Sequence, residues 1–377
     1  MKKHALIIVF GIFILLQPLS GQTWQSAKRL TWTTDDSDNQ EIAVDSNNNI
    51  HVVWIEDASG DEEVYYKRST DGGASWTTKR LTYDPDGSAF PDIAVATNNH
   101  IHVVWQAYTL GNYEIYYKGS TNGGAAWTTK RLTYTSGSSV SPAIATDSNN
   151  HIHVVWHEGV PGSYEIYYKK STNGGTSWST KRLTYNSGDS YGPAIVVDSN
   201  NHIHVAWTDR TPGNWEIHYK KSTNGGTTWT AKRLTYNSGS SSNPAIAVGS
   251  NNHIHVVWED KTHGNTEIYY KKSTNGGVTW TTKRLSYNSG VSTGPDIAVD
   301  LNNNLHVAWM DYTPINAEIY NKRSTDGGAS WTTTRLTWNS GQSYYPAIGV
   351  DSDNNIHVVW WDRTPGNSEI YYRKGIQ

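Results

Sequence analysis

Short runs of alternating apolar and polar residues fill this chain, and turn residues separate them. One stretch shows four such runs: Pro142–Asp147, His151–Trp156, Tyr164–Lys170 and Trp178–Tyr185. Their period of two and their β-branched and aromatic residues predict β-strands, here named A, B, C and D in chain order. Almost no segment has the 3.6-residue period of a helix, so we expect an all-β protein.

The four-strand unit repeats every 51 residues. An Arg-Leu pair marks each copy, and its arginines are Arg29, Arg80, Arg131, Arg182, Arg233, Arg284 and Arg335. No insertion or deletion separates the copies. Seven units of four antiparallel strands predict a seven-bladed β-propeller.

The two ends of the repeat array complement each other. The last unit has strands A to C and then Gly375 where the next turn serine would fall, so strand D is missing. The first segment, Trp24–Trp32, is a surplus strand D. We expect this N-terminal strand to complete the last blade, which closes the ring and leaves no free sheet edge. Trp24 stands one residue out of register, which predicts a small bulge or a different lid.

An eight-residue motif lies between strands C and D, as in Ser171–Trp178 (STNGGTSW). Asx followed by two glycines supplies the positive φ angles of a tight turn, and the Asx side chain can bind the turn amides. The motif resembles the Asp-box, or BNR repeat, of the sialidase superfamily, in which it is a structural turn away from the catalytic face. Its Asx residues are Asp71, Asn122, Asn173, Asn224, Asn275 and Asp326.

The resemblance does not extend to a catalytic pattern. Active sialidases have six blades, an arginine triad that begins in a Phe/Tyr-Arg-Ile-Pro motif, and a Tyr–Glu nucleophile pair. This chain lacks that motif, and all its loops have the same length. We therefore expect a member without catalytic residues. The alternative is a sialidase-like exo-glycoside hydrolase with a divergent site around Arg210, Asp209 and Tyr191.

Several residue types recur in every blade, and we interpret them as structural. Strand B has seven histidines, which the ring would hold too far apart to share a metal ion. We expect them to be buried and hydrogen-bonded, and the second histidines His100, His151, His202 and His253 to be solvated near the A–B turns. We expect core positions for the strand B tryptophans and for the strand D aromatics Trp32, Tyr83, Tyr134, Tyr185, Tyr236, Tyr287 and Trp338. Carboxylates open strand C and follow strand B, where we expect them to bind loop amides of the B–C turn.

The first 21 residues are typical of a secretory signal: Lys2 and Lys3, the apolar run Ala5–Leu16, then small residues up to Gly21. We expect cleavage near Gly21 and a secreted, extracellular or periplasmic, monomer made of one domain, residues 22–377. The run of 12 residues is short for a membrane span, and an uncleaved anchor is the alternative.

No cysteine is present, and a net charge of −3 argues against a nucleic-acid surface. No cofactor or metal is expected.

Function is expected on the face shared by the D–A and B–C loops, because the repeats vary there, whereas the Asp-box face is nearly invariant. Exposed aromatic rings beside charges suit stacking on sugars or packing against a protein. We predict a non-enzymatic protein that binds glycans, at one or several inter-blade sites, or cell-surface and extracellular proteins. A scaffold in a larger assembly is a further alternative. The candidate ligand-binding residues are Phe90, Tyr108, Tyr113, Tyr164, Tyr191, Arg210, Trp215, Tyr312, Tyr344, Tyr345, Trp361 and Arg363. Charged or titratable neighbours are Lys261, Asp189 and His157.

Overall fold

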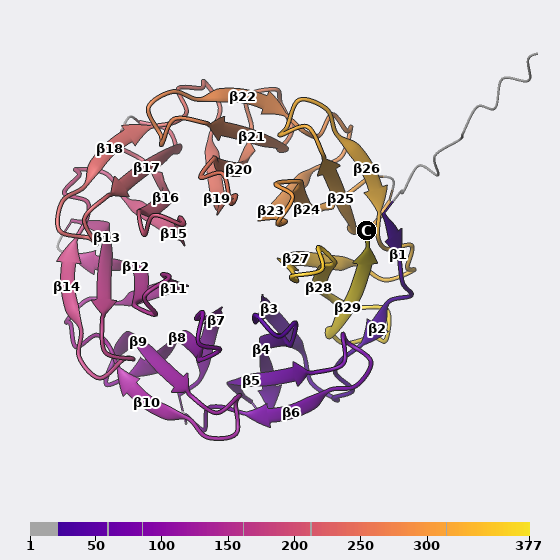
Figure 1. The fold of residues 1–377 in the computed structure, drawn as a ribbon, viewed down its shortest axis with the longest axis horizontal. Coiled ribbons are helices and arrows are strands. Elements are labelled where there is room, and N and C mark those ends of the chain that lie inside the picture. Colours follow the sequence, from indigo (N-terminus) through magenta and orange to yellow (C-terminus); the bar gives the residue numbers. More distant parts are fainter. Residues whose placement is uncertain (1–21, 59, 85, 161, 212, 314) are drawn as a thin grey trace, which may run out of the picture.

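The computed structural model describes residues 22–377 except 59, 85, 161, 212 and 314. These residues form a closed ring of seven four-stranded antiparallel sheets around a central channel (Figure 1). The expected signal sequence, residues 1–21, lies outside the described residues. The seven-bladed propeller predicted from the repeats is confirmed.

Each blade runs from an innermost strand A to an outermost strand D. Blade 1 comprises β3 (Ser37–Val44), β4 (Ile50–Ala58), β5 (Asp61–Ser69) and β6 (Thr77–Arg80). Blade 2 comprises β7 (Ser88–Val95), β8 (Ile101–Thr109), β9 (Asn112–Ser120) and β10 (Thr128–Arg131). Blade 3 comprises β11 (Ser139–Thr146), β12 (Ile152–Val160), β13 (Ser163–Ser171) and β14 (Ser179–Arg182). Blade 4 comprises β15 (Ser190–Val197), β16 (Ile203–Asp209), β17 (Glu216–Ser222) and β18 (Thr230–Arg233).

The remaining blades follow the same order. Blade 5 comprises β19 (Ser241–Val248), β20 (Ile254–Asp260), β21 (Glu267–Ser273) and β22 (Thr281–Arg284). Blade 6 comprises β23 (Ser292–Val299), β24 (Leu305–Asp311), β25 (Glu318–Ser324) and β26 (Thr332–Arg335). Blade 7 comprises β27 (Ser343–Val350), β28 (Ile356–Asp362) and β29 (Glu369–Ile376), with β1 (Thr23–Trp24) and β2 (Lys28–Arg29) as its outer edge.

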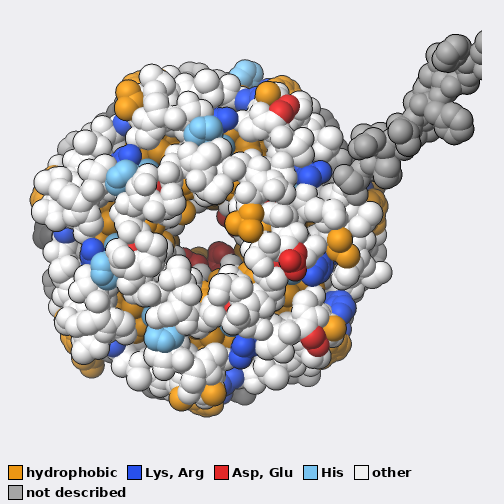
Figure 2. All heavy atoms as spheres, viewed as in Figure 1, with side chains coloured by type: hydrophobic (Ala, Val, Ile, Leu, Met, Phe, Trp, Pro, Cys, Tyr) orange, Lys and Arg blue, Asp and Glu red, His pale blue; other side chains and the backbone are white. Residues whose placement is uncertain are grey.

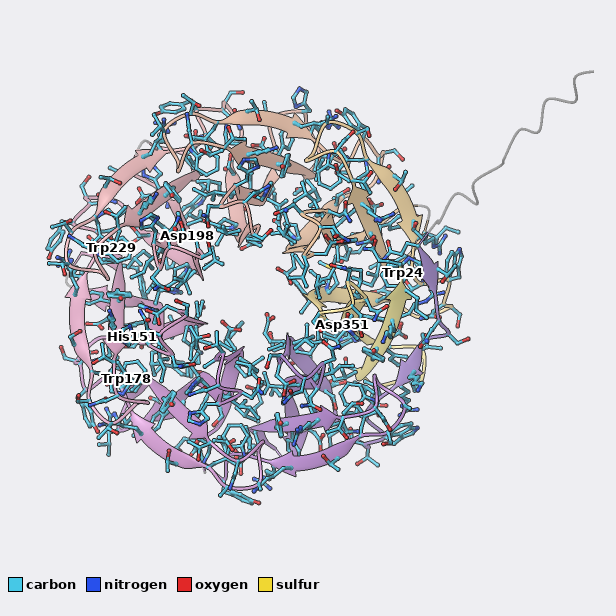
Figure 3. The ribbon with its side chains drawn as sticks, viewed as in Figure 1. Trp24, His151, Trp178, Asp198, Trp229 and Asp351 are labelled. Carbon is cyan, nitrogen blue, oxygen red and sulfur yellow. The ribbon has the colours of Figure 1, made fainter. Side chains whose placement is uncertain are left out.

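The N-terminal segment closes the ring as predicted, in two pieces. Trp24 pairs with Gly375 in β29, and Lys28 pairs with Tyr372 of the same strand. Four steps along the N-terminal segment therefore match three along β29. This one-residue excess is the bulge that the register of Trp24 predicts. Trp24 packs on the core between blades 6 and 7, and Figure 3 shows it in the outer part of the ring, as Trp178 and Trp229 are elsewhere.

The core consists of layers between adjacent blades, each centred on a strand B tryptophan. The layer between blades 2 and 3, for example, holds Trp156 with Ile144 and Leu132. The seven strand B tryptophans are at most 2% exposed, as predicted: Trp54, Trp105, Trp156, Trp207, Trp258, Trp309 and Trp360.

The strand B histidines are also buried as predicted. In blade 3, His153 Nδ1 lies 2.8 Å from the Tyr168 hydroxyl of strand C, and Nε2 lies 3.3 Å from Asp147 of the A–B turn. Of the second histidines, His151 and His202 bind the same turn aspartates and are half-buried. Their predicted place at the A–B turn is correct, but their solvation is only partial.

The predicted core position of the strand D aromatics is wrong. Strand D is short and ends at the arginine of the Arg-Leu pair, so the aromatic residue three positions later lies beyond the sheet, on the surface. The leucine enters the core instead. Arginine guanidinium groups lie over these rings, as Arg80 does at 4.4 Å from the Tyr83 ring centre. The seven residues are 62–74% exposed: Trp32, Tyr83, Tyr134, Tyr185, Tyr236, Tyr287 and Trp338.

Within the described residues, no helix is long and apolar enough to cross a membrane.

Candidate functional site

The Asp-box motif forms a tight turn whose groups bind one another. In blade 3, the amides of Gly175 and Ser177 bind the Ser171 hydroxyl and the Asn173 side-chain oxygen, each at 2.9 Å. Gly174 and Gly175 have φ angles of 65° and 88°, which favour glycine. Trp178 donates its indole N–H to Gly175 at 2.9 Å and packs edge-on against a tyrosine of the preceding blade. The polar groups of the motif are thus used within the turn.

The repeated carboxylates also have structural roles. Glu165, which opens strand C and is wholly buried, pairs with Arg182 at 2.8 Å and accepts the Asn186 amide of the D–A loop. The predicted binding of B–C loop amides by these glutamates is therefore wrong, because the loop they reach is the D–A loop. The prediction is correct for the aspartates after strand B, since Asp209 accepts the Thr211 amide at 2.9 Å.

Asp209 is unsuited to catalysis in this structure. It is wholly buried and also accepts bonds from the Trp207 indole at 3.0 Å and the Ser190 hydroxyl at 2.9 Å. Burial raises its pKa, but the hydrogen bonds from Thr211 and Trp207 outweigh burial and hold the pKa below its ordinary value. Every oxygen of the carboxylate is occupied, so it does not face a substrate.

On the loop face, the junction of blades 3 and 4 brings together four candidate residues. Tyr164 and Tyr191 have ring centres 4.9 Å apart, and Trp215 follows at 5.5 Å from Tyr191. The Arg210 guanidinium lies over the Trp215 ring at 5.5 Å. His157 packs edge-on against Tyr191 at 4.9 Å. We call these five residues the blade 3–4 cluster.

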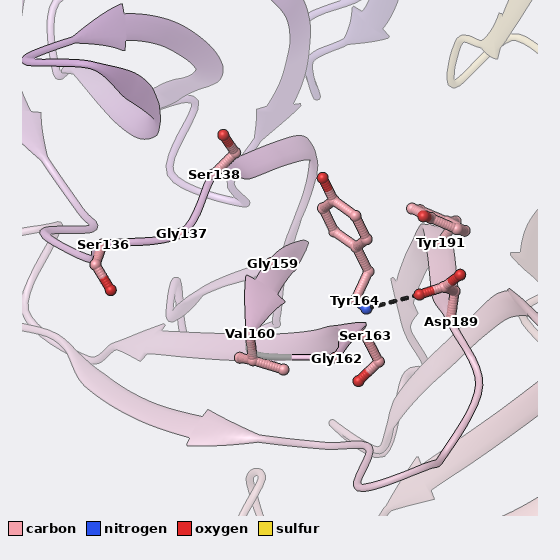
Figure 4. A pocket seen from close by; sticks show the side chains of 10 residues that line it. All are labelled: Ser136, Gly137, Ser138, Gly159, Val160, Gly162, Ser163, Tyr164, Asp189 and Tyr191. Carbon is pink, nitrogen blue, oxygen red and sulfur yellow. Dashed lines mark hydrogen bonds between the residues drawn. The ribbon is translucent and has the colours of Figure 1, made fainter.

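Beside this cluster the surface is hollowed to about 550 Å³ (Figure 4). Tyr164, Tyr191 and Asp189 form one wall, while serines and glycines of two loops form the other. Gly159 explains the hollow, because the other blades have a side chain at this position, such as Arg210 or Lys261. A side chain on the facing Gly137 is impossible, since its Cβ would lie 1.7 Å from the Gly159 carbonyl oxygen.

The groups in and beside the hollow include a carboxylate held in place by a hydrogen bond, a neutral imidazole and a protonated tyrosine. Asp189 accepts the Tyr164 amide at 3.0 Å, which fixes its carboxylate at the rim. Burial lowers the pKa of His157 to about 4, so the imidazole is neutral at pH 7. The Gly192 amide points to His157 Nδ1 at 3.5 Å, which favours the tautomer with its proton on Nε2. Burial, and then Asp189, raise the pKa of Tyr191, so its hydroxyl stays protonated and can donate.

A second group of candidates gathers between blades 6 and 7. Tyr344 stacks on Trp361 at 4.1 Å, and the Arg363 guanidinium lies 5.2 Å from the Trp361 ring centre. Tyr312 and Tyr345 lie at 6.4 Å from Tyr344. Burial raises the pKa of Tyr312 to about 12. Tyr344 and Trp361 thus lie closer together than Tyr164 and Tyr191, whose ring centres are 4.9 Å apart.

The other candidates do not join either group. Tyr108 and Tyr113 form an edge-on pair at 5.3 Å across strands β8 and β9. Phe90 lies in the bulge of strand A, where it has a φ of 51° and is 48% exposed. Tyr345 occupies the same bulge in blade 7, with a φ of 44°. A left-handed conformation is costly for such bulky residues, and other blades have Asn, Ser or Gly there.

Sequence reasoning named the rings at these junctions but did not recognise the hollow. Its cause is a missing side chain, Gly159, and its wall joins residues from three loops. The signal was present as a departure from the repeat, because Gly159 stands where the other six blades have a residue with a side chain.

The channel contains a further set of polar groups, on the innermost strands. Glu41, Asp92 and Asp296 occupy equivalent positions where four blades have alanine. Acidic side chains are visible in the channel wall (Figure 2). Asp92 and Asp296 each accept an amide of the next blade, from Ile144 at 2.8 Å and Ile348 at 2.9 Å. In the part of the chain that the structure describes, no three His, Asp or Glu side chains come close enough to hold a metal ion.

Comparisons with known proteins agree with this architecture. A family model described as "BNR repeat-containing family member" matches residues 67–239. Among curated proteins, none matches the sequence.

Solved structures of similar fold include an ulvan lyase of polysaccharide lyase family 25, solved bound to -[GlcA(1-4)Rha3S]-. It has a TM-score of 0.65 and 12% identity over 92% of this chain and 95% of that chain. A protein of unknown function from Dyadobacter fermentans DSM 18053 has a TM-score of 0.62 and 14% identity over 95% of this chain and 100% of that chain. A Trypanosoma rangeli sialidase has a TM-score of 0.50 and 12% identity over 79% of this chain and 56% of that chain. At these identities the likeness shows the fold alone.

Proposed function

Because this chain is a seven-bladed β-propeller with BNR repeats, we propose that it binds carbohydrate on its loop face, through the blade 3–4 cluster. The observation that carries the proposal is the continuous aromatic wall of Tyr164, Tyr191 and Trp215 beside an open hollow. Sugar rings present an apolar face that stacks on aromatic side chains, while their hydroxyls need polar partners at the edge.

The polar groups around the wall match this requirement. Asp189 accepts hydrogen bonds, Arg210 donates them and carries a positive charge, and the serines of both loops do either. Arg210 also favours a saccharide with a carboxylate or sulfate group, because a guanidinium binds such groups in bidentate fashion. The ulvan lyase and the sialidase of similar fold are carbohydrate-active proteins, which supports this class of ligand by analogy of fold.

Electrophoresis through gels containing one neutral or one acidic polysaccharide each tests the proposal. The intact mature chain should be retarded by at least one of them, and Tyr191→Ala and Trp215→Ala should remove the retardation. Tyr83→Ala is the matched control, because this ring is 73% exposed and follows β6 in blade 1, away from blades 3 and 4. Equal retardation of the Trp215→Ala variant and the parent chain would place binding elsewhere, and free migration in every gel would refute the proposal.

Cleavage of a glycan at the same cluster is the second candidate. What favours it is that Tyr191 lies near both Asp189 and Arg210, which gives a tyrosine, a carboxylate and an arginine in one place. A sialidase-like hydrolase would have to use these residues, since Asp209 is occupied. Release of sugar from a panel of fluorogenic glycosides, lost in Tyr191→Phe but kept in Tyr83→Phe, would establish activity. A silent panel together with retained gel retardation would favour binding alone.

We further infer that the chain is exported and cleaved near Gly21. The support is the basic and apolar pattern of residues 1–21. Mass spectrometry of the protein from a secreting host should find Gln22 as the first residue; an intact Met1 in the exported protein would contradict this.

A further inference from the structure

Neighbouring blades are linked on the Asp-box face by a cation that reaches across to the next box. In four blades, a Lys or Arg just before the box serine donates to the carbonyl of the first box glycine in the next blade. The distances are 3.1 Å for Arg68 and Gly123, 3.5 Å for Lys170 and Gly225, 3.5 Å for Lys221 and Gly276, and 3.0 Å for Lys272 and Gly327.

Two further junctions place a cation at the same position. Lys374 of blade 7 reaches Gly72 of blade 1, with its ammonium 3.4 Å from where a Cβ on Gly72 would lie. Arg323 of blade 6 donates to the Gln377 side chain, which stands in for the missing box carbonyl. Six of the seven junctions are therefore occupied.

The junction of blades 2 and 3 lacks this cation. Gly119 stands where the other blades have Lys or Arg, and no atom lies within 4 Å of a Cβ built on the facing Gly174. A cavity of about 140 Å³ opens here, lined by His102, Tyr117, Trp127 and both glycines among others. We call this cavity the vacant slot.

The turn carboxylate is missing at the same junction. Ala96 replaces the aspartate that binds the strand B histidine in five other blades, so among the described residues His102 keeps only its bond to Tyr117, at 2.8 Å. Burial lowers the pKa of His102 to about 4, and the slot therefore has no positive charge from this imidazole at pH 7.

Blade 5 shows that the carboxylate is not needed to hold an ammonium group. Gly249 replaces the aspartate there, yet Lys272 still donates to Gly327 at 3.0 Å. A carbonyl acceptor between the boxes is sufficient, and Gly174 offers one in the vacant slot. Trp127 and Tyr117 add aromatic walls, which attract cations.

We propose that the vacant slot binds a primary alkylammonium group. Such a group is the chemical equivalent of the end of a lysine side chain, and the other six junctions are filled by a Lys or Arg of this chain. The group comes either from a free alkylamine or from a lysine presented by another molecule. This site lies on the Asp-box face and is independent of the function proposed for the loop face. A single ammonium group and four methylenes give a dissociation constant in the millimolar range.

n-Butylammonium is the first probe, because it has the length of a lysine side chain. Saturation-transfer NMR with the mature protein should show its binding at up to about 50 mM. Tetramethylammonium, which has no N–H donor, should not displace it. Gly119→Lys fills the slot from within and should abolish the signal. The new Cβ meets the buried Tyr117 hydroxyl, so this ring must shift, and the thermal midpoint of the variant is measured to establish that it is folded. Blade 3 has lysine at the equivalent position, Lys170.

The reciprocal variant is Lys272→Gly, which creates a second slot in a blade that already lacks the aspartate. It should raise the butylammonium signal about twofold if both sites bind equally. Equal signals from the parent chain and Gly119→Lys, or no signal from the parent chain, would overturn the proposal. Competition by Nα-acetyl-lysine methylamide separates the two sources: displacement points to a lysine within a chain, and failure to displace points to a free amine.

Discussion

The Tyr168 hydroxyl lies 2.8 Å from Nδ1 of His153, and both residues are almost completely buried. The same pair occurs in six blades; in blade 6, Asn321 replaces the tyrosine, and Nδ1 of the buried His306 has no partner among the described residues. Removing one hydroxyl from a complete pair should therefore leave a buried ring nitrogen unpaired. We expect Tyr168→Phe to lower the free energy of unfolding by about 1–3 kcal/mol, measured by urea denaturation. Tyr185→Phe, at a residue 74% exposed, is the control and should leave stability unchanged. A neutral Tyr168→Phe variant would mean that water replaces the hydroxyl.

The channel carboxylates predict a pH dependence. Burial raises the pKa of Asp92 to about 7 and that of Asp296 to about 6, and burial with repulsion from both aspartates raises the pKa of Glu41. A carboxyl with a raised pKa in the folded state favours the protonated form, so folding loses stability as pH rises from the unfolded-state pKa near 4 to the folded-state value. Below about pH 4 both states are protonated and the difference vanishes.

Asp92→Ala tests this sign, since alanine occupies the position in four blades. The substitution should change the free energy of unfolding by about 1–2 kcal/mol more favourably at pH 8 than at pH 4. This figure is already reduced to allow for solvent in the channel. Thermal unfolding at several pH values gives the comparison. Ala143→Ser is a neutral control in the next blade. A difference between parent and variant that does not change with pH would show that Asp92 is not protonated in the folded ring.

Tyr345 combines strain with exposure. Its φ of 44° lies in the region that asparagine tolerates, and Asn39 and Asn243 occupy the same bulge in other blades. Tyr345→Asn should therefore raise the free energy of unfolding by about 1 kcal/mol. If ligands contact this ring, glycan retardation should fall in the same variant. A variant that is less stable would show that packing of the ring against its neighbours outweighs the backbone strain.

Ring closure predicts a large effect of the first segment. Leu30 is 2% exposed and packs in the layer between blades 7 and 1, and Arg29 pairs with the buried Glu369 at 2.6 Å. In a mature chain that begins at residue 34, the free energy of unfolding should fall by several kcal/mol, because a core leucine is removed and a buried carboxylate loses its partner. Calorimetry should show a lower midpoint and increased aggregation from the exposed edge of β29. Arg80→Ala, which breaks one equivalent pair within a blade, is the matched control and should cost less than the deletion.

The sequence was sufficient for the fold because repetition supplies the strand count, the register and the closure. It failed for the strand D aromatics, since Tyr185 follows Leu183 at a spacing that suits a continued strand, whereas β14 ends at Arg182. It also assigned the strand C glutamates to the nearer loop, because their partners in the D–A loop are 21 residues away in sequence.

The candidate sites could be anticipated only in part. Tyr164, Tyr191 and Trp215 were recognised as departures from the repeat, but their contact depends on the junction of two blades. The vacant slot could not be predicted from the sequence, because it forms between Gly119 and Gly174, which is 55 residues later. The repeat pattern alone does not show which residues face each other across a junction.

The pairing of Arg29 with Glu369 joins residues 340 positions apart. During synthesis at about 5–20 residues per second, the first strand would wait roughly twenty seconds to a minute for its partner to be made. Six blades can form in order through local hairpins, while the seventh waits for both ends. The N-terminal segment must therefore stay soluble and unpaired throughout translation. A chaperone that shields it would bind nascent chains and not the folded propeller.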